Sequence, residues 1–180
     1  MKIDVELIAL DLNTCTRCVG TLSKIEQALR IVQPVLNELE IQARLSQIIV
    51  KTEEEATRQR LVTSPTVRIN GQDIANETFE NECSSCSDLC GCEEGTTCRL
   101  WHYRGTEFTE APVGLIVEAI LQRALSNSQV SNQNATESVY AGLPENLKRF
   151  FAGKRRKSGQ LETTCCSQSE AQSCCAPSEK

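Results

Sequence analysis

Residues 13–18 have the sequence Asn-Thr-Cys-Thr-Arg-Cys. An apolar run precedes them at residues 2–12, where apolar and polar side chains first alternate as they do in a strand. From Cys18 to about Glu40, apolar side chains recur every three or four residues, which is the pattern of one face of a helix. Two cysteines separated by two residues therefore lie at a predicted strand-to-helix junction, and they are the most specific chemical signal in the chain.

The predicted helix after this junction contains two features that bear on its limits. Asn13 or Thr14 can serve as its N-cap, because short polar side chains accept hydrogen bonds from the first free N–H groups. Pro34 lies inside the apolar pattern and has no N–H group to donate. We therefore expect the helix to kink or to divide near Val32.

The order of the predicted elements is strand, helix, strand, helix, strand, strand, helix, which indicates an α/β fold. These elements fall at residues 2–12, 18–40, 41–50, 51–61, 67–69 and 99–104, with a final helix from Pro112 to about Leu125. Thr52 and Glu55 form a capping-box pattern at the second helix. Asn70-Gly71 is a strong signal for a tight turn after the third strand.

The chain divides into two regions by composition. Residues 1–126 form the predicted folded domain, with a cysteine-rich insertion at 80–98 before the fourth strand. Residues 127–180 are polar and are expected to form a disordered, flexible C-terminal extension. Within that extension, residues 143–151 are amphipathic over one or two turns and could dock on the domain.

Composition limits the classes of function. The net charge is −5, so general nucleic-acid binding is not expected. The sequence has 11 cysteines and one histidine, which favours redox pairs or all-thiolate metal sites. No signal peptide and no transmembrane segment is evident, so we expect a cytoplasmic protein. Cysteines in that compartment are mostly reduced and more often catalytic or metal-binding than structural.

Two motifs resemble those of the thioredoxin family. Cys15-Thr16-Arg17-Cys18 resembles its C-x-x-C at the start of the first core helix, and Ser64-Pro65-Thr66 resembles its cis-proline loop. More closely, the chain resembles an uncharacterised thioredoxin-like family, a domain of unknown function with some members labelled selenoproteins. The stretches that carry this second resemblance are residues 10–18, 64–71, 98–105 and 111–112.

These resemblances imply a thioredoxin-like β-α-β-α-β-β-α fold in which Pro65 lies against the C-x-x-C. The chain lacks the Trp-Cys-Gly-Pro-Cys centre of thioredoxin and adds the insertion and the cysteine-bearing tail. A general disulfide reductase activity therefore does not follow from the resemblance.

The first functional hypothesis is a thiol–disulfide oxidoreductase. Cys15 would be the nucleophile, since a helix N-terminus lowers the pKa of a thiol, and Cys18 would be the resolving thiol. Pro65 in the cis form would present the backbone of Ser64 to an extended substrate. The partner would be a protein or small-molecule disulfide or thiol, and no cofactor is required. Alternatively, Cys15 and Cys18 supply two of the four ligands of a zinc or iron–sulfur site.

The insertion carries a second group of cysteines, at positions Cys83, Cys86, Cys90, Cys92 and Cys98. Four closely spaced thiolates can bind zinc or an iron–sulfur cluster. Alternatively, Cys83 and Cys86 are a second dithiol that exchanges disulfides with Cys15 and Cys18. A third interpretation is that these cysteines fasten a long loop.

The tail carries two cysteine doublets, Cys165-Cys166 and Cys174-Cys175. Adjacent thiols chelate soft ions such as zinc, arsenite, mercury(II) and copper(I). Doublets of this kind are similar to those of arsenic metallochaperones, although they can also be incidental to a low-complexity tail. The second functional hypothesis is therefore a protein that binds or carries a thiophilic metal or metalloid, through the insertion and tail cysteines.

Overall fold

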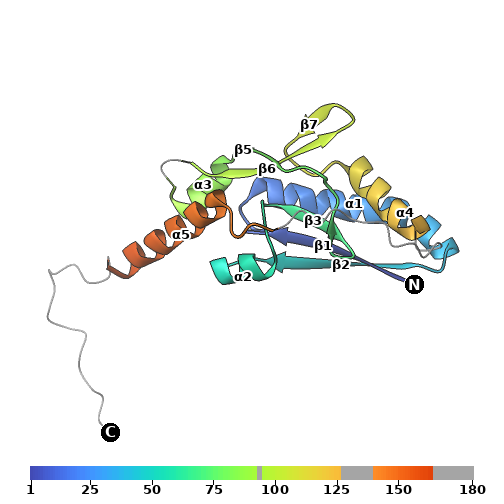
Figure 1. Cartoon of the computed structure of the whole chain (residues 1–180), viewed down its shortest axis with the longest axis horizontal. Coiled ribbons are helices and arrows are strands. Elements are labelled where there is room, and N and C mark those ends of the chain that lie inside the picture. Colours follow the sequence, from blue (N-terminus) through green and yellow to red (C-terminus); the bar gives the residue numbers. More distant parts are fainter. Residues whose placement is uncertain (93–94, 127–139, 164–180) are drawn as a thin grey trace, which may run out of the picture.

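The computed structural model describes residues 1–92, 95–126 and 140–163, and it has a mixed α/β fold (Figure 1). The strands are β1 (Lys2–Ala9), β2 (Gln42–Ile49), β3 (Thr66–Ile69), β4 (Gln72–Asp73), β5 (Phe79–Glu82), β6 (Thr97–Tyr103) and β7 (Thr106–Phe108). The helices are α1 (Thr16–Glu38), α2 (Glu53–Arg58), α3 (Ser84–Cys90), α4 (Val113–Ser126) and α5 (Glu145–Thr163).

The first sheet has the strand order β2-β1-β3-β4. β1 is parallel to β2 and antiparallel to β3, and β3 is antiparallel to β4. The β1–β2 connection contains α1, as a parallel pair requires. Asn70 and Gly71, with φ angles of 51° and 81°, join β3 to β4. Both residues need positive φ, so the predicted tight turn is confirmed.

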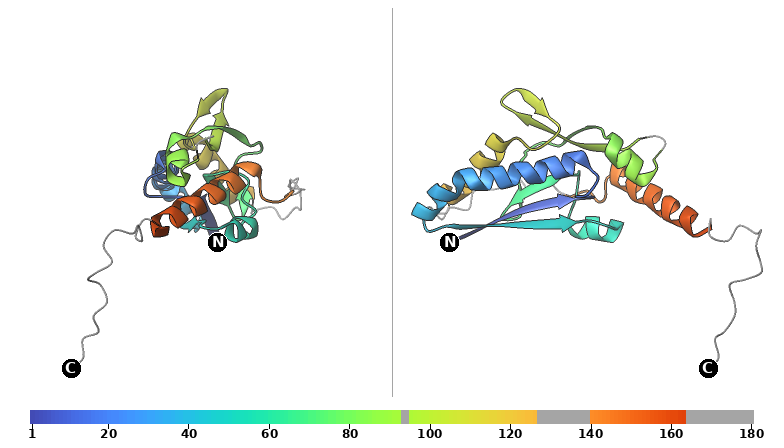
Figure 2. Two further views of the ribbon diagram at one scale, coloured as in Figure 1. Left: turned by 90° about the vertical axis from the view of Figure 1, so that its left-hand side faces the viewer. Right: turned by 180° about the vertical axis from the view of Figure 1, so that it is seen from behind.

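Helix α1 buries one face and lies along the first sheet (Figure 2). Its buried residues, spaced by three or four positions, are Cys18, Thr21, Ile25, Ala28, Val32 and Leu36. The expected division near Val32 is absent, because the helix continues through Pro34 to Glu38. Val32 and Leu36 are both buried, and their packing on either side of Pro34 supports the continuous helix.

The strand predicted at residues 99–104 forms, as β6, but it does not join the first sheet. It lies in a separate sheet of order β5-β6-β7, and β4 is the fourth strand of the first sheet. The tight turn at Asn70 supplies β4 directly, which accounts for the difference from prediction. β5 and α3, which precede β6, were not predicted, because neither is long enough to show a clear hydrophobic period.

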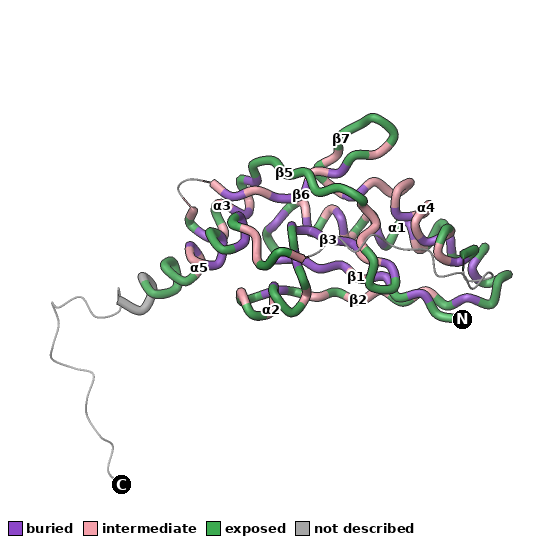
Figure 3. The backbone as a smooth tube through the Cα atoms, viewed as in Figure 1, coloured by how far each residue is buried: buried purple, intermediate pink, exposed green. Residues whose placement is uncertain are grey.

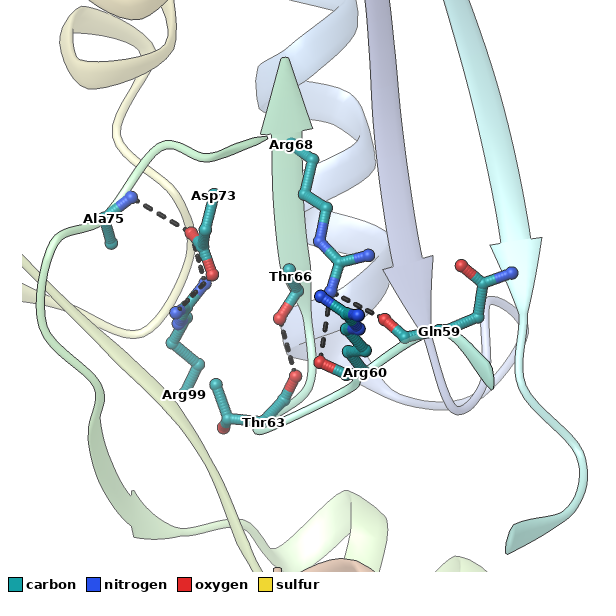
Figure 4. Close-up of polar contacts among 8 residues, drawn as sticks. All are labelled: Gln59, Arg60, Thr63, Thr66, Arg68, Asp73, Ala75 and Arg99. Atoms are coloured by element: carbon teal, nitrogen blue, oxygen red, sulfur yellow. Dashed lines mark hydrogen bonds and ion pairs between the residues drawn. The ribbon is translucent and has the colours of Figure 1, made fainter. Parts of the chain in front are cut away.

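Arg99 fastens the second sheet to the first. Its guanidinium is buried and donates two hydrogen bonds to the Asp73 carboxylate, at 3.0 and 2.8 Å (Figure 4). Its backbone N–H donates to the carbonyl of Ser64 at 2.9 Å. Side chain and backbone together hold β6 against β4 and against the loop before β3.

The loop before β3 is held by polar contacts that Figure 4 also shows. Arg68 donates to the carbonyls of Gln59 and Arg60, at 2.7 and 3.2 Å. The Thr66 hydroxyl donates to the carbonyl of Thr63 at 2.7 Å. The loop therefore has a defined shape where it carries Ser64 and Pro65.

The other two predicted helices form with small differences. α2 begins after Thr52, whose hydroxyl accepts from the N–H of Glu55 at 3.2 Å, and Glu55 accepts in return from Lys51 rather than from Thr52. α4 begins just after Pro112 and packs along α1. Leu125, near the predicted end of this helix, is exposed, and the buried positions are Ile116, Ile120 and Ala124.

Part of the expected flexible extension is a helix. α5 spans 19 residues, far more than the one or two turns expected, and buries Leu147, Phe150 and Phe151. It packs on α3 and α2, at the end of the molecule away from the N-terminus (Figures 1 and 2). Docking of residues 143–151 is thus confirmed. The stretches expected to be disordered at 127–139 and 164–180 lie outside the described residues.

The interior has two packed clusters, which appear as buried segments in Figure 3. The first lies between the first sheet, α1 and α4. The second lies where α3 and α5 meet the ends of β1 and α1, and it is rich in cysteine. Its buried cysteines are Cys15, Cys18, Cys83, Cys86, Cys90 and Cys98.

Among the helices that the structure describes, none combines the length and the hydropathy that crossing a bilayer requires.

Candidate metal centre

Four cysteines from three elements bring their sulfur atoms together. Cys15 precedes α1, Cys83 precedes α3, Cys86 is in α3 and Cys98 is in β6. All four Sγ atoms lie within 4.8 Å of one another, and all four residues are buried. The Sγ of Cys86 is 3.6 Å from that of Cys15 and 3.1 Å from that of Cys98. We call these four residues the four-cysteine cluster.

Asp11 fixes the backbone that presents Cys15. One oxygen of its carboxylate accepts hydrogen bonds from the N–H groups of Asn13, Thr14 and Cys15, at 3.0, 2.5 and 2.9 Å. The Thr14 hydroxyl donates to the same oxygen at 2.9 Å. Burial acts to raise the pKa of Asp11, but the hydrogen bonds from Thr14, Cys15 and Asn13 outweigh it, and the pKa is lowered.

The N-cap of α1 therefore differs from the predicted one, and the helix begins at Thr16. Cys15 itself is the N-cap of α1, in an extended conformation and without a side-chain cap, so the expected caps at Asn13 and Thr14 are wrong. Asp11 already takes up the N–H groups in this loop, which leaves no such role for the two polar side chains. An Asp two to four residues before free N–H groups was the sequence signal for this loop.

The two residues between Cys15 and Cys18 bind the insertion. The Thr16 hydroxyl is 3.2 Å from that of Ser85. Arg17 donates to the side chain of Asn81 and to the carbonyl of Glu82, both at 2.5 Å. Arg17 thus brings one positive charge to the segment that carries Cys83. This charge would partly compensate the negative charge of buried thiolates.

Cys18 belongs to the motif but not to the four-cysteine cluster. It is fully buried, and its Sγ lies 3.7 Å from the Ser64 hydroxyl. The Ser64–Pro65 peptide bond is cis, as the thioredoxin resemblance implies. The Ser64 hydroxyl also accepts from the N–H of Leu10, at 3.2 Å. The sequence-predicted residues Cys15, Cys18 and Pro65 are thus brought to one end of the first sheet.

Hydrogen bonds among these thiols separate their pKa values. Hydrogen bonds from Cys18, and then from Cys83, Cys86 and Cys98, lower the pKa of the Cys15 thiol. The contact with Cys15 in turn raises the pKa of Cys18, Cys86 and Cys98, with burial adding to the effect. The contact with Cys15 acts to raise the pKa of Cys83, but the hydrogen bonds with Cys86 and Cys98 lower this pKa to about 7. Cys15 is therefore the thiol whose ionised form its neighbours favour most.

The other cysteines of the insertion are placed differently. Cys90 and Cys92 form a disulfide with each other, so neither thiolate is available as a metal ligand in this structure. The predicted metal set of the insertion is corrected to Cys83, Cys86 and Cys98. The tail cysteines Cys165, Cys166, Cys174 and Cys175, also predicted as ligands, lie outside the described residues.

The arrangement fits a tetrahedral ion bound by four thiolates. Zinc binds cysteine sulfur at about 2.3 Å, and a tetrahedron of that size has sulfur–sulfur edges of about 3.8 Å. The separations of Cys86 Sγ from Cys15 Sγ and from Cys98 Sγ, 3.6 and 3.1 Å, are close to that edge. An iron–sulfur cluster places iron and sulfide between the thiolates and needs a wider spacing than 4.8 Å. The site can therefore hold a single thiophilic ion.

The surroundings of Cys15 and Cys18 do not favour thiol–disulfide exchange with a substrate. Cys15 and Cys18 each have no exposed surface. The Ser64 carbonyl, expected to be available to a substrate backbone, accepts from Arg99 of β6. In this conformation the insertion covers the C-x-x-C, and Arg99, which follows the insertion in β6, makes the hydrogen bond that an extended peptide would make.

Comparison with known proteins gives a family but no activity. Searches among curated proteins and among solved structures returned no match. A family profile matches residues 1–120, which includes the first sheet, α1 and all four residues of the four-cysteine cluster. The chain belongs to the family described as "Domain of unknown function (DUF2703)".

Proposed function

We propose that this protein binds one thiophilic metal ion, with zinc as the best fit, through Cys15, Cys83, Cys86 and Cys98. The observation that carries the proposal is the convergence of four buried sulfur atoms within 4.8 Å of one another. Thiolate ligands select zinc and related soft ions, and four of them close the coordination sphere. A closed, buried site of this kind is typical of structural or storage metal sites, not of catalytic ones.

The ligands are arranged so that the ion would join two parts of the molecule. Cys15 comes from the loop before α1, whereas the other three come from the segment 83–98. Binding free energy at such a site is also folding free energy, because the ligands converge only in the folded chain. We infer a reducing compartment, expected to be the cytoplasm, because the thiols must stay reduced to bind the ion.

The fold supports a relation to thioredoxin-like proteins, which we propose on the strand arrangement. The first sheet has the order β2-β1-β3-β4, with β1 and β2 parallel and β3 antiparallel to both neighbours. The order of β1, α1, β2, α2, β3 and α4 agrees with the order inferred from the sequence, whereas the last strand of this sheet is the short β4 and not the strand predicted at residues 99–104. The second sheet and α3 are then additions that cover the C-x-x-C end.

The test measures zinc binding by the reduced full chain in which Cys165, Cys166, Cys174 and Cys175 are replaced by serine, here called the tail-serine chain. Native mass spectrometry should show one zinc per chain. Cys15→Ser should weaken zinc binding by more than about 100-fold, since even loss of a supporting contact costs about 10–100-fold. The matched control is Cys18→Ser, which changes an equally buried thiol outside the cluster and should keep the zinc.

Two results would contradict the proposal. One is a reduced tail-serine chain that gains no zinc at low micromolar concentration. The other is equal loss of zinc in Cys15→Ser and Cys18→Ser, which would mean that the C-x-x-C pair binds the ion as a unit.

Thiol–disulfide exchange at Cys15 and Cys18 is the second candidate function. It is favoured by the position of the pair at the N-terminus of α1, beside the cis Ser64–Pro65 bond. Exchange requires the insertion to move away, because both thiols are buried. Cys18→Ser should then accumulate a mixed disulfide with a substrate protein, and Cys15→Ser should not. Turnover that is intact in both variants would exclude this function.

A further inference from the structure

We propose that Cys18 is a redox modification site that controls the metal centre: disulfide formation between Cys15 and Cys18 removes one ligand and releases the ion. This inference rests on the proposed function, because it requires Cys15 to be a ligand. Cys15 would then either bind the ion or form the disulfide, but not both at once.

The geometry gives Cys15 two partners of different kinds. Its Sγ lies 3.6 Å from that of Cys86, within the four-cysteine cluster. Cys18 lies three residues further along, in the first turn of α1, and is buried in the same packed cluster as Cys15. Cys18 is not a member of the four-cysteine cluster and faces the hydroxyl of Ser64 instead. A free thiol therefore lies beside one ligand of the proposed ion.

Cys15 is also the ligand whose loss matters most to the connection between the two parts of the molecule. Cys83, Cys86 and Cys98 belong to one segment, and Cys15 is the cluster member that comes from the first α/β unit. A Cys15–Cys18 disulfide would leave three thiolates on the segment and none on the α1 side. The ion would lose a ligand and its bridging position in the same step.

The oxidant that we propose is hydrogen peroxide, which is small and uncharged and so compatible with two buried thiols. The Cys15 thiolate attacks one peroxide oxygen, the O–O bond breaks, and hydroxide leaves, giving a sulfenic acid. The Cys18 thiol then attacks the Cys15 sulfur, the S–O bond breaks, and hydroxide leaves and takes up the thiol proton as water. Two electrons pass from the two sulfurs to the peroxide. A dithiol reductant reverses the modification.

The state of the other cysteines explains why Cys18, and not another thiol, would form the disulfide with Cys15. In the metal-bound state Cys83, Cys86 and Cys98 direct their sulfur lone pairs at the ion. Cys90 and Cys92 are already joined to each other. Among the described cysteines, Cys18 is the thiol that is neither a cluster member nor in a disulfide.

The experiment uses the zinc-loaded tail-serine chain and a pulse of hydrogen peroxide. Released zinc is followed with a chromogenic chelator, and the disulfides are mapped by peptide mass spectrometry after thiol blocking. We expect one zinc released for each Cys15–Cys18 disulfide formed, and recovery of binding after a dithiol is added. Cys18→Ser should release zinc at least about ten-fold more slowly, because the sulfenic acid lacks its resolving thiol.

A double variant, Cys90→Ser with Cys92→Ser, serves as the control, because it removes the other cysteine pair and leaves the C-x-x-C intact. It should release zinc at the rate of the tail-serine chain. Equal release rates with and without Cys18 would overturn the inference, as would a mapped disulfide within the set Cys83, Cys86 and Cys98. If the reduced chain binds no zinc before peroxide is added, the proposed function itself fails, and the inference fails with it.

Discussion

At the scale of single residues, Asp11 determines how Cys15 is presented. Its carboxylate accepts three backbone N–H groups of residues 13–15, so the loop before α1 has a single well-defined shape. The Cys15 sulfur then reaches the cluster, while Cys18, on the next turn, points at Ser64. A half-buried carboxylate therefore sets the position of a buried cysteine.

Replacing Asp11 tests this role. Asp11→Ala should lower the free energy of unfolding by about 1 kcal/mol, the usual effect of losing a side chain that caps free N–H groups. Zinc affinity of the tail-serine chain should fall with it, by about 10–100-fold, as for loss of a supporting contact. Asp11→Asn keeps an acceptor oxygen and should recover most of both losses. Chemical denaturation and competition with a zinc chelator measure the two effects, and unchanged affinity in Asp11→Ala would contradict the role.

At the scale of elements, the docking of α5 depends on a close approach at Gly153. A Cβ built on Gly153 would lie 2.7 Å from the Cys92 Sγ and 2.8 Å from the Cys90 carbonyl oxygen. Only a residue without a side chain fits there, since the carbonyl is backbone and cannot turn away. The Cys90–Cys92 disulfide therefore lies directly under the helix.

Two glycine substitutions on α5 separate docking from helix propensity. Gly153→Ala should destabilise the docked helix by about 1–3 kcal/mol, the usual cost of overpacking. Gly159→Ala adds a Cβ with nothing within 4 Å and should stabilise the helix, by about 0.5–1 kcal/mol. Hydrogen exchange of α5 amides measures both, and protection that rises in both variants would show that the close contact does not limit docking.

The link between β6 and α4 provides a pH-dependent contribution to stability. Glu118 accepts from the Tyr103 hydroxyl at 2.9 Å and forms an ion pair with Arg104. These two hydrogen bonds, from Tyr103 first and then Arg104, lower the pKa of Glu118 below its ordinary 4.5. A lowered folded-state pKa means that the contribution is present above pH 4.5 and is lost as the pH falls through the folded pKa.

Comparison with Glu118→Gln detects this contribution. The wild-type chain should be more stable than the variant at pH 7, and the difference should shrink as the pH falls from 4.5 toward 3. Thermal unfolding at several pH values is the measurement. A difference that is constant over this range would mean that the charge of Glu118 does not contribute.

At the scale of the whole molecule, two contacts hold the insertion and β6 to the first sheet. One is the ion pair between the buried Arg99 and the partly exposed Asp73, and the other is the proposed ion between Cys15 and the segment 83–98. Asp73→Ala leaves the Arg99 guanidinium buried without its partner and should cost about 3 kcal/mol. The matched control is Asp4→Ala, which removes an exposed carboxylate from the same sheet and should cost far less.

Zinc removal should weaken the connection between Cys15 and the segment 83–98. At a free zinc concentration of 100 times Kd, the ion adds about 2.7 kcal/mol to the free energy of unfolding. A chelator should therefore lower Tm and increase proteolysis within residues 79–103 while the first sheet stays protected. Uniform protection with and without the chelator would mean that the ion does not join the two parts. The tail-serine chain is the material for both measurements.

The sequence by itself determined β1, β2 and β3, the helices α1, α2 and α4, and the C-x-x-C at the start of α1. Those features depend on local information: the hydrophobic period, the Asn70-Gly71 turn and the Thr52 cap. The sequence also indicated that thiol chemistry or metal binding occurs, because 11 cysteines stand beside one histidine. The amphipathic pattern of residues 143–151 allowed docking on the domain but did not decide it.

Only the tertiary structure decided which thiols meet. Cys15 and Cys18 are equivalent in the motif, yet the first joins Cys83, Cys86 and Cys98 and the second does not. Likewise, β6 left the first sheet, and Cys90 paired with Cys92. Apart from the Cys90–Cys92 disulfide, these outcomes depend on contacts between residues far apart in the sequence, such as Arg17 with Glu82. Sequence periodicity reports which face of an element is buried, but not which distant element packs against it.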